Sequence, residues 1–188
     1  SILALDKTGT LTTGQPELTD LIPIPELERK DVLRSLAAVE ALSEHPVAKA
    51  IIRIACDEGI NIPAVRNFEA LPGYGVTGEV EGTKIHVGTK RYMNNLGIDI
   101  SGFNTEFRHL SGEGKTLLFY SVEEKASAII AVSDRIKSSA SIATKRLQDL
   151  GIRIALVTGD IRRTALAIGN ALGINKIVAE ALPNTKVE

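Results

Sequence analysis

The chain has 188 residues, of which 44% are hydrophobic and 24% are charged, and its formal net charge is -1. This composition allows a normal hydrophobic core in one large domain or two small ones, and the lack of a basic face argues against nucleic-acid binding. The single cysteine, Cys56, excludes an internal disulfide and favours a reducing compartment. Its position within an apolar helical pattern predicts a core residue.

The predicted elements of the first part of the chain follow from the spacing of its apolar residues. Two stretches have helical spacing, and Pro46 marks the start of the second helix. Alternation around a turn at Glu81-Gly82 predicts a hairpin. In chain order we expect a buried strand at 2–6, an extended stretch at 13–25, helices over 26–42 and 45–59, and the hairpin over 75–88.

The second part of the chain changes character after Asp134. Before this residue, two apolar runs around Glu123-Glu124-Lys125 predict a pair of strands. After it, helical and strand patterns alternate, which is typical of parallel α/β units. In chain order we expect strands over 116–122 and 126–132, a helix over 138–150, a strand over 152–157, a helix over 161–172 and a strand over 176–179.

The first strand and the last segment therefore both fit an α/β domain, whereas the stretch between them has an α+β pattern with hairpins. A discontinuous α/β domain with an inserted α+β domain explains both parts. We expect the α/β domain to comprise 1–18 and 129–188, and the inserted domain to comprise 19–128.

The stretch LDKTGTLT at 5–12 places Asp6 at the end of the first predicted strand. In an open parallel sheet, ligands bind beyond the carboxyl ends of the strands. The motif Thr158-Gly159-Asp160 ends another predicted strand and would face the same crevice. An aspartate there can act as a nucleophile toward phosphorus and form an acyl phosphate. The simpler interpretation is that Asp6 and Thr8 only cap a helix or turn.

Phosphoryl transfer depends on positioning and on neutralising charge. Lys7 and Lys186 could supply cations, with magnesium as a third. Thr158 could donate a hydrogen bond to a transferred phosphoryl oxygen.

The string DKTGTLT at 6–12 resembles the phosphorylation signature of the P-type ATPases, which belong to the haloacid dehalogenase superfamily. Further segments resemble family motifs: VTGD at 157–160, Pro183 and Lys186 in LPNTK, and Asp134 and Lys137 in SDRIK. The resemblance covers essentially the whole chain. It implies a haloacid dehalogenase-like, Rossmann-type phosphorylation domain, with an inserted nucleotide-binding domain built on an antiparallel sheet.

By this resemblance Asp6 is the phosphorylated residue, and Asp6 and the Thr8 carbonyl bind magnesium. Soluble phosphatases of the superfamily usually carry a second aspartate at the position of Thr8, and a threonine cannot act as the general base. The acyl phosphate should then last long enough to drive another step, as in a pump. The alternatives are a soluble phosphatase with 19–128 as its cap and a nucleotide-sensing module with a relic phosphorylation loop.

The segment SEHP at 43–46, together with Glu40 and the sequence Gly73-Tyr74-Gly75, resembles the nucleotide-binding domain of heavy-metal-transporting P-type ATPases. By this resemblance His45 contacts adenine, Glu40 helps to orient the purine, and the GxG stretch lets the backbone approach the nucleotide. Ser43 and Glu44 belong to the same motif. A lone His-Pro pair would more simply be a surface histidine.

One position departs from the subfamily pattern. An asparagine usually follows the glycine of VGN, and here the residue is Thr89, whose hydroxyl has a shorter reach than an amide.

Two features of the sequence are not expected to form chemical sites. SGEGKT at 111–116 suggests a phosphate-binding loop, but the first glycine of that pattern would fall on His109. Gly114 and Lys115 are instead expected to form a turn that leads into a strand. His86 and His109 lie outside any metal-ligand spacing with Cys56.

The resemblance implies the cytosolic ATP-binding and phosphorylation portion of a heavy-metal P-type ATPase, with copper(I) favoured by SEHP. The implied cofactors are ATP and Mg²⁺. The implied partners are the transmembrane and actuator domains of the same pump, and the fragment itself is expected to be monomeric. The full-length protein would lie in a cell membrane with this portion facing the cytoplasm.

The family's Gly-Asp-Gly-x-Asn-Asp motif does not occur in these 188 residues. We therefore expect a piece of a larger protein, with little turnover by itself.

Overall fold

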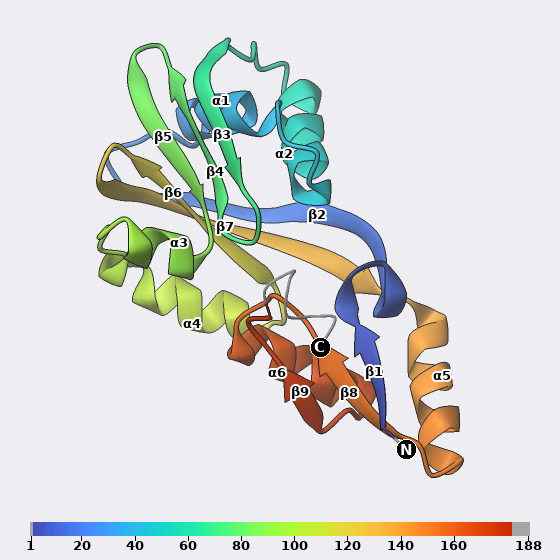
Figure 1. The fold of residues 1–188 in the computed structure, drawn as a ribbon. Coiled ribbons are helices and arrows are strands. Elements are labelled where there is room, and N and C mark those ends of the chain that lie inside the picture. Colours follow the sequence, from blue (N-terminus) through green and yellow to red (C-terminus); the bar gives the residue numbers. More distant parts are fainter. Residues whose placement is uncertain (1, 182–188) are drawn as a thin grey trace. The chain divides into compact units, whose positions relative to one another are not determined.

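The computed structural model describes residues 2–181 and divides the chain into two compact units (Figure 1). Unit 1 comprises Ser1–Pro16, His109–Thr116 and Ser133–Glu188. Unit 2 comprises Glu17–Arg108 and Leu117–Val132. The domain bounds expected from the sequence stay a prediction about how the whole protein is organised. Among residues 2–181, no helix has both the length and the apolar character needed to cross a membrane.

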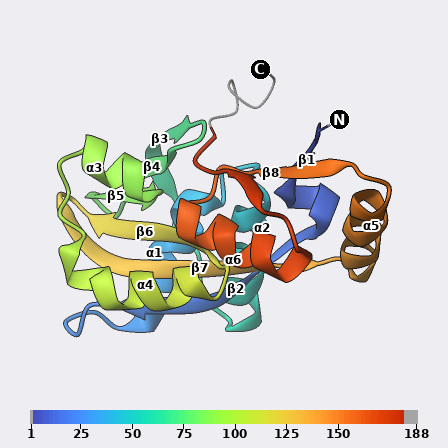
Figure 2. The same ribbon diagram turned by 90° about the horizontal axis from the view of Figure 1, so that it is seen from below.

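Unit 1 contains a parallel sheet of the order β1-β8-β9, formed by Ile2–Asp6, Arg153–Val157 and Lys176–Val178. Two helices accompany it, α5 (Ser138–Asp149) and α6 (Arg162–Leu172), and α6 runs along the sheet in Figure 2. The core lies between these elements and includes Leu156, Ala165, Ile168, Leu172 and Ala140. This arrangement is the α/β architecture that the alternating pattern predicted.

The prediction that the first strand is buried was wrong, although the strand itself is present. Ile2 is 46% exposed and Leu3 is 37% exposed. The reason is its place in the sheet: among the described residues β1 is an edge strand, hydrogen-bonded on one side to β8. Burial then rises along β1 toward Asp6, which is half-buried.

Unit 2 is built on a six-stranded sheet of the order β2-β7-β6-β5-β4-β3, in which the pairs between β3 and β6 are antiparallel. The strands are β2 (Thr12–Pro23), β3 (Val65–Leu71), β4 (Gly75–Val80), β5 (Thr83–Gly88), β6 (Thr116–Val122) and β7 (Lys125–Ile136). The ends of β2, β6 and β7 reach into unit 1. The hairpin of β4 and β5 turns at Glu81-Gly82, as predicted, and both turn residues have positive φ, as a type I′ turn requires.

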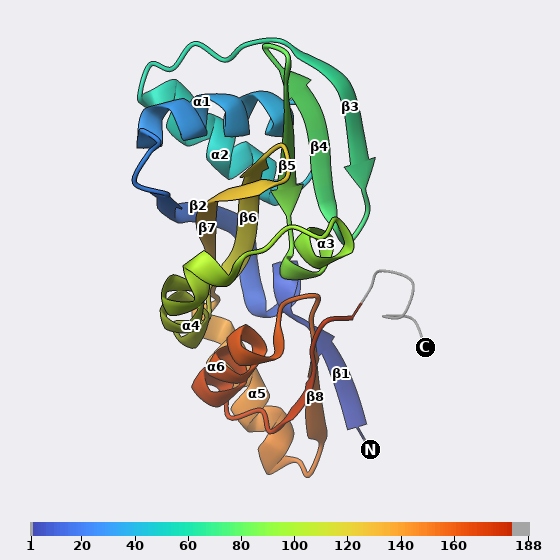
Figure 3. The same ribbon diagram turned by 90° about the vertical axis from the view of Figure 1, so that its left-hand side faces the viewer.

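Two helices, α1 (Arg29–Glu40) and α2 (Pro46–Asp57), cover one face of this sheet (Figure 3). The other face carries Phe119, which stacks on Phe107 with ring centroids 6.0 Å apart. Because neighbouring strand residues point to opposite faces, Tyr120 faces α1 and bonds Ser35 there. Phe107 belongs to α4 (Asn104–Gly112), which follows α3 (Lys90–Asn95) and a short helical turn at Ser101–Phe103.

The prediction that Cys56 lies in the core was wrong, because its side chain is exposed. The buried stripe of α2 runs through Val47, Ala48, Ala50, Ile51 and Ala55. Each helical residue is turned by about 100° from the one before it, so Cys56 points away from the stripe.

Candidate functional site

Asp6 and the Thr158-Gly159-Asp160 motif lie at the same edge of the unit 1 sheet. In the parallel register of β1 and β8, Asp6 is the partner of Val157, so the motif begins one residue beyond Asp6's neighbour. This is the carboxyl edge, where parallel sheets bind ligands. The sequence predicted this juxtaposition. After Asp6 the chain turns over Lys7–Leu11, where Thr8 is exposed and the backbone is non-helical at Thr8 and at Gly9, which has a φ of 77°.

Lys7 is not an open cation beside Asp6. Its ammonium forms an ion pair with Asp160, and both side chains are only 7% exposed. Lys7 also donates a hydrogen bond of 3.1 Å to the hydroxyl of Thr116. The charge that the sequence suggested for a phosphoryl group is therefore already balanced by Asp160 in this structure.

Thr158 is 2% exposed, and its hydroxyl is engaged within its own loop. It donates to Asp160 Oδ2 at 3.1 Å and accepts from the Asp160 N–H at 3.2 Å. Glu180 N–H donates to the Asp160 carbonyl, and Ala181 N–H donates to the Thr158 carbonyl. The loop that contains Gly159 is thus fixed by its own side chains and by the end of the described chain.

The turn that follows Asp6 is held by Asp134 and Lys137, the two residues of the SDRIK segment that resemble a family motif. The carboxylate of Asp134 accepts hydrogen bonds from Thr12 Oγ1 at 2.5 Å and from Thr13 Oγ1 at 2.9 Å. The ammonium of Lys137 donates to the Gly9 carbonyl at 2.6 Å. These contacts tie the turn to the end of β7, through Asp134, and to the N-cap of α5, Lys137. Pro183 and Lys186 lie outside the described residues.

The SGEGKT segment begins in the last turn of α4, and its Gly114-Lys115 turn leads into β6, as predicted. The N–H groups of Glu113 and Lys115 donate to the Leu110 carbonyl, and the N–H of Gly114 donates to Ser111. Because these donors are satisfied by the end of the helix, they cannot form the cradle of amides that holds a phosphate in a true P-loop.

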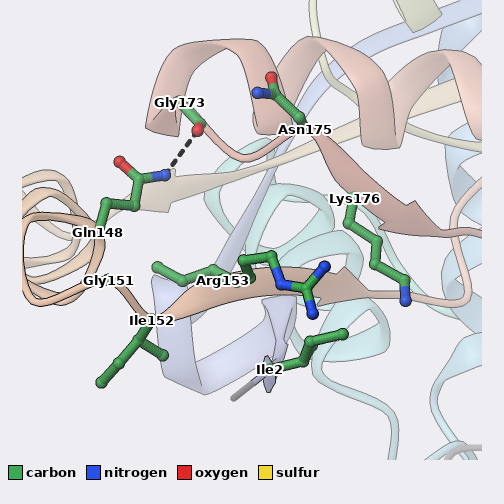
Figure 4. A pocket seen from close by; sticks show the side chains of 9 residues that line it. Ile2, Gln148, Gly151, Ile152, Arg153, Gly173, Asn175 and Lys176 are labelled. Carbon is green, nitrogen blue, oxygen red and sulfur yellow. Dashed lines mark hydrogen bonds between the residues drawn. The ribbon is translucent and has the colours of Figure 1, made fainter.

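A cavity of about 690 Å³ opens elsewhere in unit 1 (Figure 4). Its lining includes Ile2 and Arg153, the first residues of β1 and β8, and Lys176 at the start of β9. Asp6 and Val157 lie at the opposite ends of these strands. The cavity is therefore distinct from the candidate phosphorylation site.

In unit 2, three residues of the proposed adenine motif form one hydrogen-bonded chain. The Ser43 side chain bonds the Glu40 carboxyl group. The same hydroxyl accepts from the His45 N–H at 3.3 Å. The His45 ring Nδ1 in turn accepts from the Val47 N–H at 3.3 Å and caps α2, in which Pro46 is the first residue. Glu44 lies between them and is exposed.

The electrostatic state of this chain of residues follows from burial. Glu40 is the last residue of α1 and is 5% exposed, and desolvation raises its pKa to about 7 despite the bond from Ser43. The His45 ring is exposed at one side but crowded by protein atoms, and this desolvation lowers its pKa. Because Nδ1 acts as an acceptor, the neutral ring carries its proton on Nε2, where it can donate to a ligand.

The glycine motif and Thr89 form a second set of contacts in unit 2. The Thr89 N–H donates to the Tyr74 carbonyl at 2.8 Å. Gly75 pairs with Gly88 across β4 and β5, while Gly73 lies in the preceding turn with a φ of 79°. The Thr89 hydroxyl accepts from the Tyr92 N–H at 3.2 Å, so it caps α3.

Both sets are attached to one hydrophobic core. Val39 precedes Glu40 and Val47 follows the SEHP motif, while Val76 and Val87 adjoin the two paired glycines, and all four valines belong to the same buried cluster. The two sets of candidate residues come from distant stretches of the sequence, and both are anchored to the same hydrophobic core of unit 2.

Two residues that support the candidate sites, Tyr92 and Thr116, were not predicted from the sequence. Tyr92 lies under the Thr89 loop, 5% exposed, and its hydroxyl contacts His86 Nδ1 at 3.1 Å. Thr116 contacts Lys7 across 109 positions of sequence. A hydroxyl-bearing residue gives no sequence pattern that would reveal such long-range partners. Among the described residues, no group of three or more His, Cys, Asp or Glu side chains is arranged to hold a metal ion.

The geometry agrees with a comparison of the sequence with family models. The model of the haloacid dehalogenase-like hydrolases matches residues 1–187. The chain belongs to this family. An acidic residue at the carboxyl edge of β1, beside a Thr-Gly-Asp loop, fits a haloacid dehalogenase-like domain.

Curated relatives of this haloacid dehalogenase-like chain are named as copper transporters. Copper-transporting ATPase 2 of Rhizobium meliloti (strain 1021) is 49% identical over 187 residues, which cover 100% of this chain and 23% of the relative. The copper-exporting P-type ATPase of Bacillus subtilis (strain 168) is 42% identical over 184 residues, which cover 98% of this chain and 23% of the relative. The chain spans about a quarter of the length of the curated relatives it matches.

Solved structures support the same fold assignment. The catalytic domain of the CPx-ATPase CopB-B, studied for conformational changes upon nucleotide binding, aligns with a TM-score of 0.75 and 26% identity. That alignment covers 100% of this chain and 63% of the other. A zinc-transporting PIB-type ATPase in the E2.Pi state aligns with a TM-score of 0.66 and 32% identity, over 98% of this chain and 30% of that one. The predicted fold class is confirmed.

Proposed function

We propose that the chain is the ATP-binding and phosphorylation portion of a heavy-metal P-type ATPase, facing the cytoplasm in a membrane-bound pump. The observation that carries the proposal is the pairing of Asp6 with the end of β8, reinforced by the ion pair between Lys7 and Asp160. It places a half-buried carboxylate at the edge of the sheet where phosphate ligands bind. The transmembrane and actuator domains of the same pump would be its partners, and the chain would act as a monomer within it.

In the proposed reaction, ATP binds to unit 2 through Glu40, Ser43 and His45. Gly73 and Gly75 let the backbone approach the nucleotide, and Thr89 holds the neighbouring loop. The Nε2–H of His45 is available toward adenine because Nδ1 is occupied by the cap of α2. Glu44 stays on the exposed side of the motif.

A carboxylate oxygen of Asp6 then attacks the γ-phosphorus. The bond between that phosphorus and the β,γ-bridging oxygen breaks, ADP leaves with the electron pair, and an acyl phosphate forms on Asp6. Hydrolysis later adds water across this bond and returns the carboxylate and inorganic phosphate. Thr8 offers no carboxylate to activate that water, so the intermediate lasts long enough to be coupled to ion movement.

The donor set near Asp6 fits magnesium in kind. The Asp6 carboxylate and the Thr8 carbonyl are oxygen donors, and Mg²⁺ commonly combines one or two carboxylates with phosphate oxygens and water. When bound, the ion would neutralise charge on the phosphoryl oxygens. Lys186 would add a second cation. We assign to Thr158, Gly159 and Asp160 the role of fixing the loop beside Asp6, and the hydrogen bonds between Thr158 and Asp160 support this assignment.

Copper(I) is the ion that we propose for the transporter. The support comes from two relatives that align with 100% and 98% of this chain and are named as copper-transporting and copper-exporting. A solved neighbour is named as zinc-transporting. A soluble phosphatase is less well supported, because Thr8 occupies the position of its acid-base residue.

The test is phosphorylation of the full-length transporter with ATP labelled at the γ-phosphate. We expect an acid-stable, hydroxylamine-sensitive label that depends on copper(I) and is lost in Asp6→Asn. Label that persists in Asp6→Asn would contradict the assignment of the acceptor. Label that depends on zinc but not copper would retain the pump and reject the ion.

A further inference from the structure

The SGEGKT segment contributes a residue to the candidate phosphorylation site, although it is no phosphate-binding loop. Its last residue, Thr116, lies beside Lys7 and Asp160 within unit 1. The hydroxyl of Thr116 accepts from Lys7 Nζ at 3.1 Å and donates to Asp160 Oδ1 at 2.7 Å. It therefore bridges the cation and the anion of a buried ion pair.

Thr116 completes the hydrogen bonding of this pair. Buried ion pairs are stable only when their remaining donors and acceptors are satisfied. Asp160 Oδ2 is contacted by Lys7 and by the Thr158 hydroxyl, and Thr116 occupies Oδ1. Removing the hydroxyl would leave one carboxylate oxygen and one ammonium proton without this partner in a site that water barely reaches.

The backbone just before Thr116 is itself held by contacts with α6. The carbonyl of Lys115, directly before Thr116, accepts a hydrogen bond of 2.7 Å from Thr164 Oγ1 on α6. Gly114 packs beside α6, where a Cβ built on it would be in van der Waals contact with Ile168 Cγ1 at 3.4 Å. Because its backbone is held in this way, the Thr116 hydroxyl is pre-organised to bond Lys7 and Asp160 in one geometry.

We propose that Thr116 is a positioning residue for phosphoryl transfer at Asp6. Lys7 follows Asp6 directly in the chain, so fixing the Lys7 ammonium between Thr116 and Asp160 fixes the start of the loop that presents the Asp6 carboxylate. The inference rests on the proposed function. Displacement of a reacting group by about 1 Å costs up to about a hundredfold in rate.

The experiment compares Thr116→Val, Thr116→Ala and Thr116→Ser in the full-length transporter. The rate of phosphoenzyme formation from ATP is measured in single turnover, and the ATP concentration for half-maximal rate is measured beside it. Removing the hydroxyl is expected to slow formation by about tenfold or more. Serine, which keeps the hydroxyl, should restore the rate to within about threefold of wild type, and half-saturation should change little in all variants.

Thr144→Val is the matched control. Thr144 is a buried threonine of the same unit, 1% exposed, whose hydroxyl donates to the carbonyls of Ser141 and Leu172. This control should keep the wild-type rate. Thermal unfolding of each variant separates a role in the site from a general loss of folding. In the isolated chain, the ¹⁵N-detected ammonium signal of Lys7 should broaden or shift in Thr116→Val and not in Thr144→Val.

Each outcome has a distinct meaning. Wild-type phosphorylation rates in both Thr116→Val and Thr116→Ala would overturn the inference. So would equal slowing in Thr116→Ser and Thr144→Val, because that pattern indicates only a structural role. Retained label in Asp6→Asn, or no label in the wild type, would reject the proposed function itself. The labelling of wild type and Asp6→Asn is therefore compared first, and the Thr116 variants are interpreted only if that comparison supports the proposed function.

Discussion

Gly75 and Gly88 face each other across β4 and β5 with no room for a side chain. A Cβ on Gly75 would lie 2.0 Å from the Val87 carbonyl oxygen, and a Cβ on Gly88 would lie 2.4 Å from the Tyr74 carbonyl oxygen. Backbone atoms cannot rotate away as a side chain can. The close approach therefore requires glycine at both positions, and the second glycine of the GxG motif is needed for the fold before any nucleotide is considered.

Gly75→Ala should destabilise unit 2 by about 3 kcal/mol, because the added methyl group forces β4 and β5 apart. Thermal or urea unfolding of the chain measures the change. Gly102→Ala is the matched control, since a Cβ at that position meets nothing within 4 Å. A neutral Gly75→Ala would show that the hairpin can shift without loss.

Glu40 should make unit 2 less stable as the pH rises. Its pKa is about 7 in the folded state against 4.5 for the free side chain. Between these values the folded state binds the extra proton, so the free energy of unfolding falls with rising pH, by roughly 3 kcal/mol in all. Glu40→Gln, which cannot ionise, should therefore stabilise unit 2 at pH 8 and change little at pH 4.

Glu44→Gln is the control for this pH series, because Glu44 is exposed on the same loop. Its stability curve should follow the wild type throughout. If Glu40→Gln and the wild type have parallel curves from pH 4 to 8, the carboxyl group does not carry a raised pKa.

His45 should have two separable roles, a cap of α2 through Nδ1 and a ligand contact through Nε2. Asparagine is a good N-cap residue, so His45→Asn should keep the stability of the helix within about 0.5 kcal/mol. The same variant should bind a non-hydrolysable ATP analogue about tenfold more weakly, a loss of about 1.4 kcal/mol. Calorimetric titration of the chain measures the affinity. Equal affinity in His45→Asn and wild type would remove the ring from the nucleotide site.

Asp134→Asn should loosen the Asp6 loop. The carboxylate accepts from Thr12 through Oδ2, from Thr13 through Oδ1 and from the Gly14 N–H through both oxygens. Asparagine keeps one of these oxygens, but the amide nitrogen that replaces the other cannot accept a hydrogen bond. Hydrogen bonds to a charged group contribute about 1.5–3 kcal/mol, so unit 1 should lose stability on that scale. Faster hydrogen exchange at the Gly14 amide reports the opening. Asp149→Asn, at an exposed position of α5, should leave that amide unchanged.

The sequence was sufficient for those features that local chemistry determines. Pro46 defined the start of α2, Glu81-Gly82 defined the hairpin, and alternation after Asp134 defined the parallel α/β part. The strand β3 was missed because a bulge between Arg66 and Glu69, with Asn67 at a φ of 50°, breaks the period of two. The helix α4 was missed although Phe103, Phe107 and Leu110 follow helical spacing, a signal that could have found it.

Other features depend on partners that only the fold brings together. The burial of Lys7 depends on Asp160 and Thr116, which lie more than a hundred positions away. The exposure of Ile2 and Leu3 depends on the place of β1 in its sheet, not on its composition. The roles assigned to Asp6, His45 and the other site residues stay predictions until the variants above are measured.

The parallel pairing of β1 with β8 has a consequence for the order in which the protein assembles on the ribosome. Ile2 pairs with Arg153, so β1 is synthesised about 150 residues before its partner, a delay of roughly 10–30 s at usual translation rates. The core of unit 2 lies between Leu21 and Val132 and can close during that interval. Until then β1 lacks the strand that accepts and donates its sheet hydrogen bonds. The strand that carries Asp6 is therefore made well before the strand it pairs with, and the sheet edge around Asp6 can form only after β8 has been synthesised.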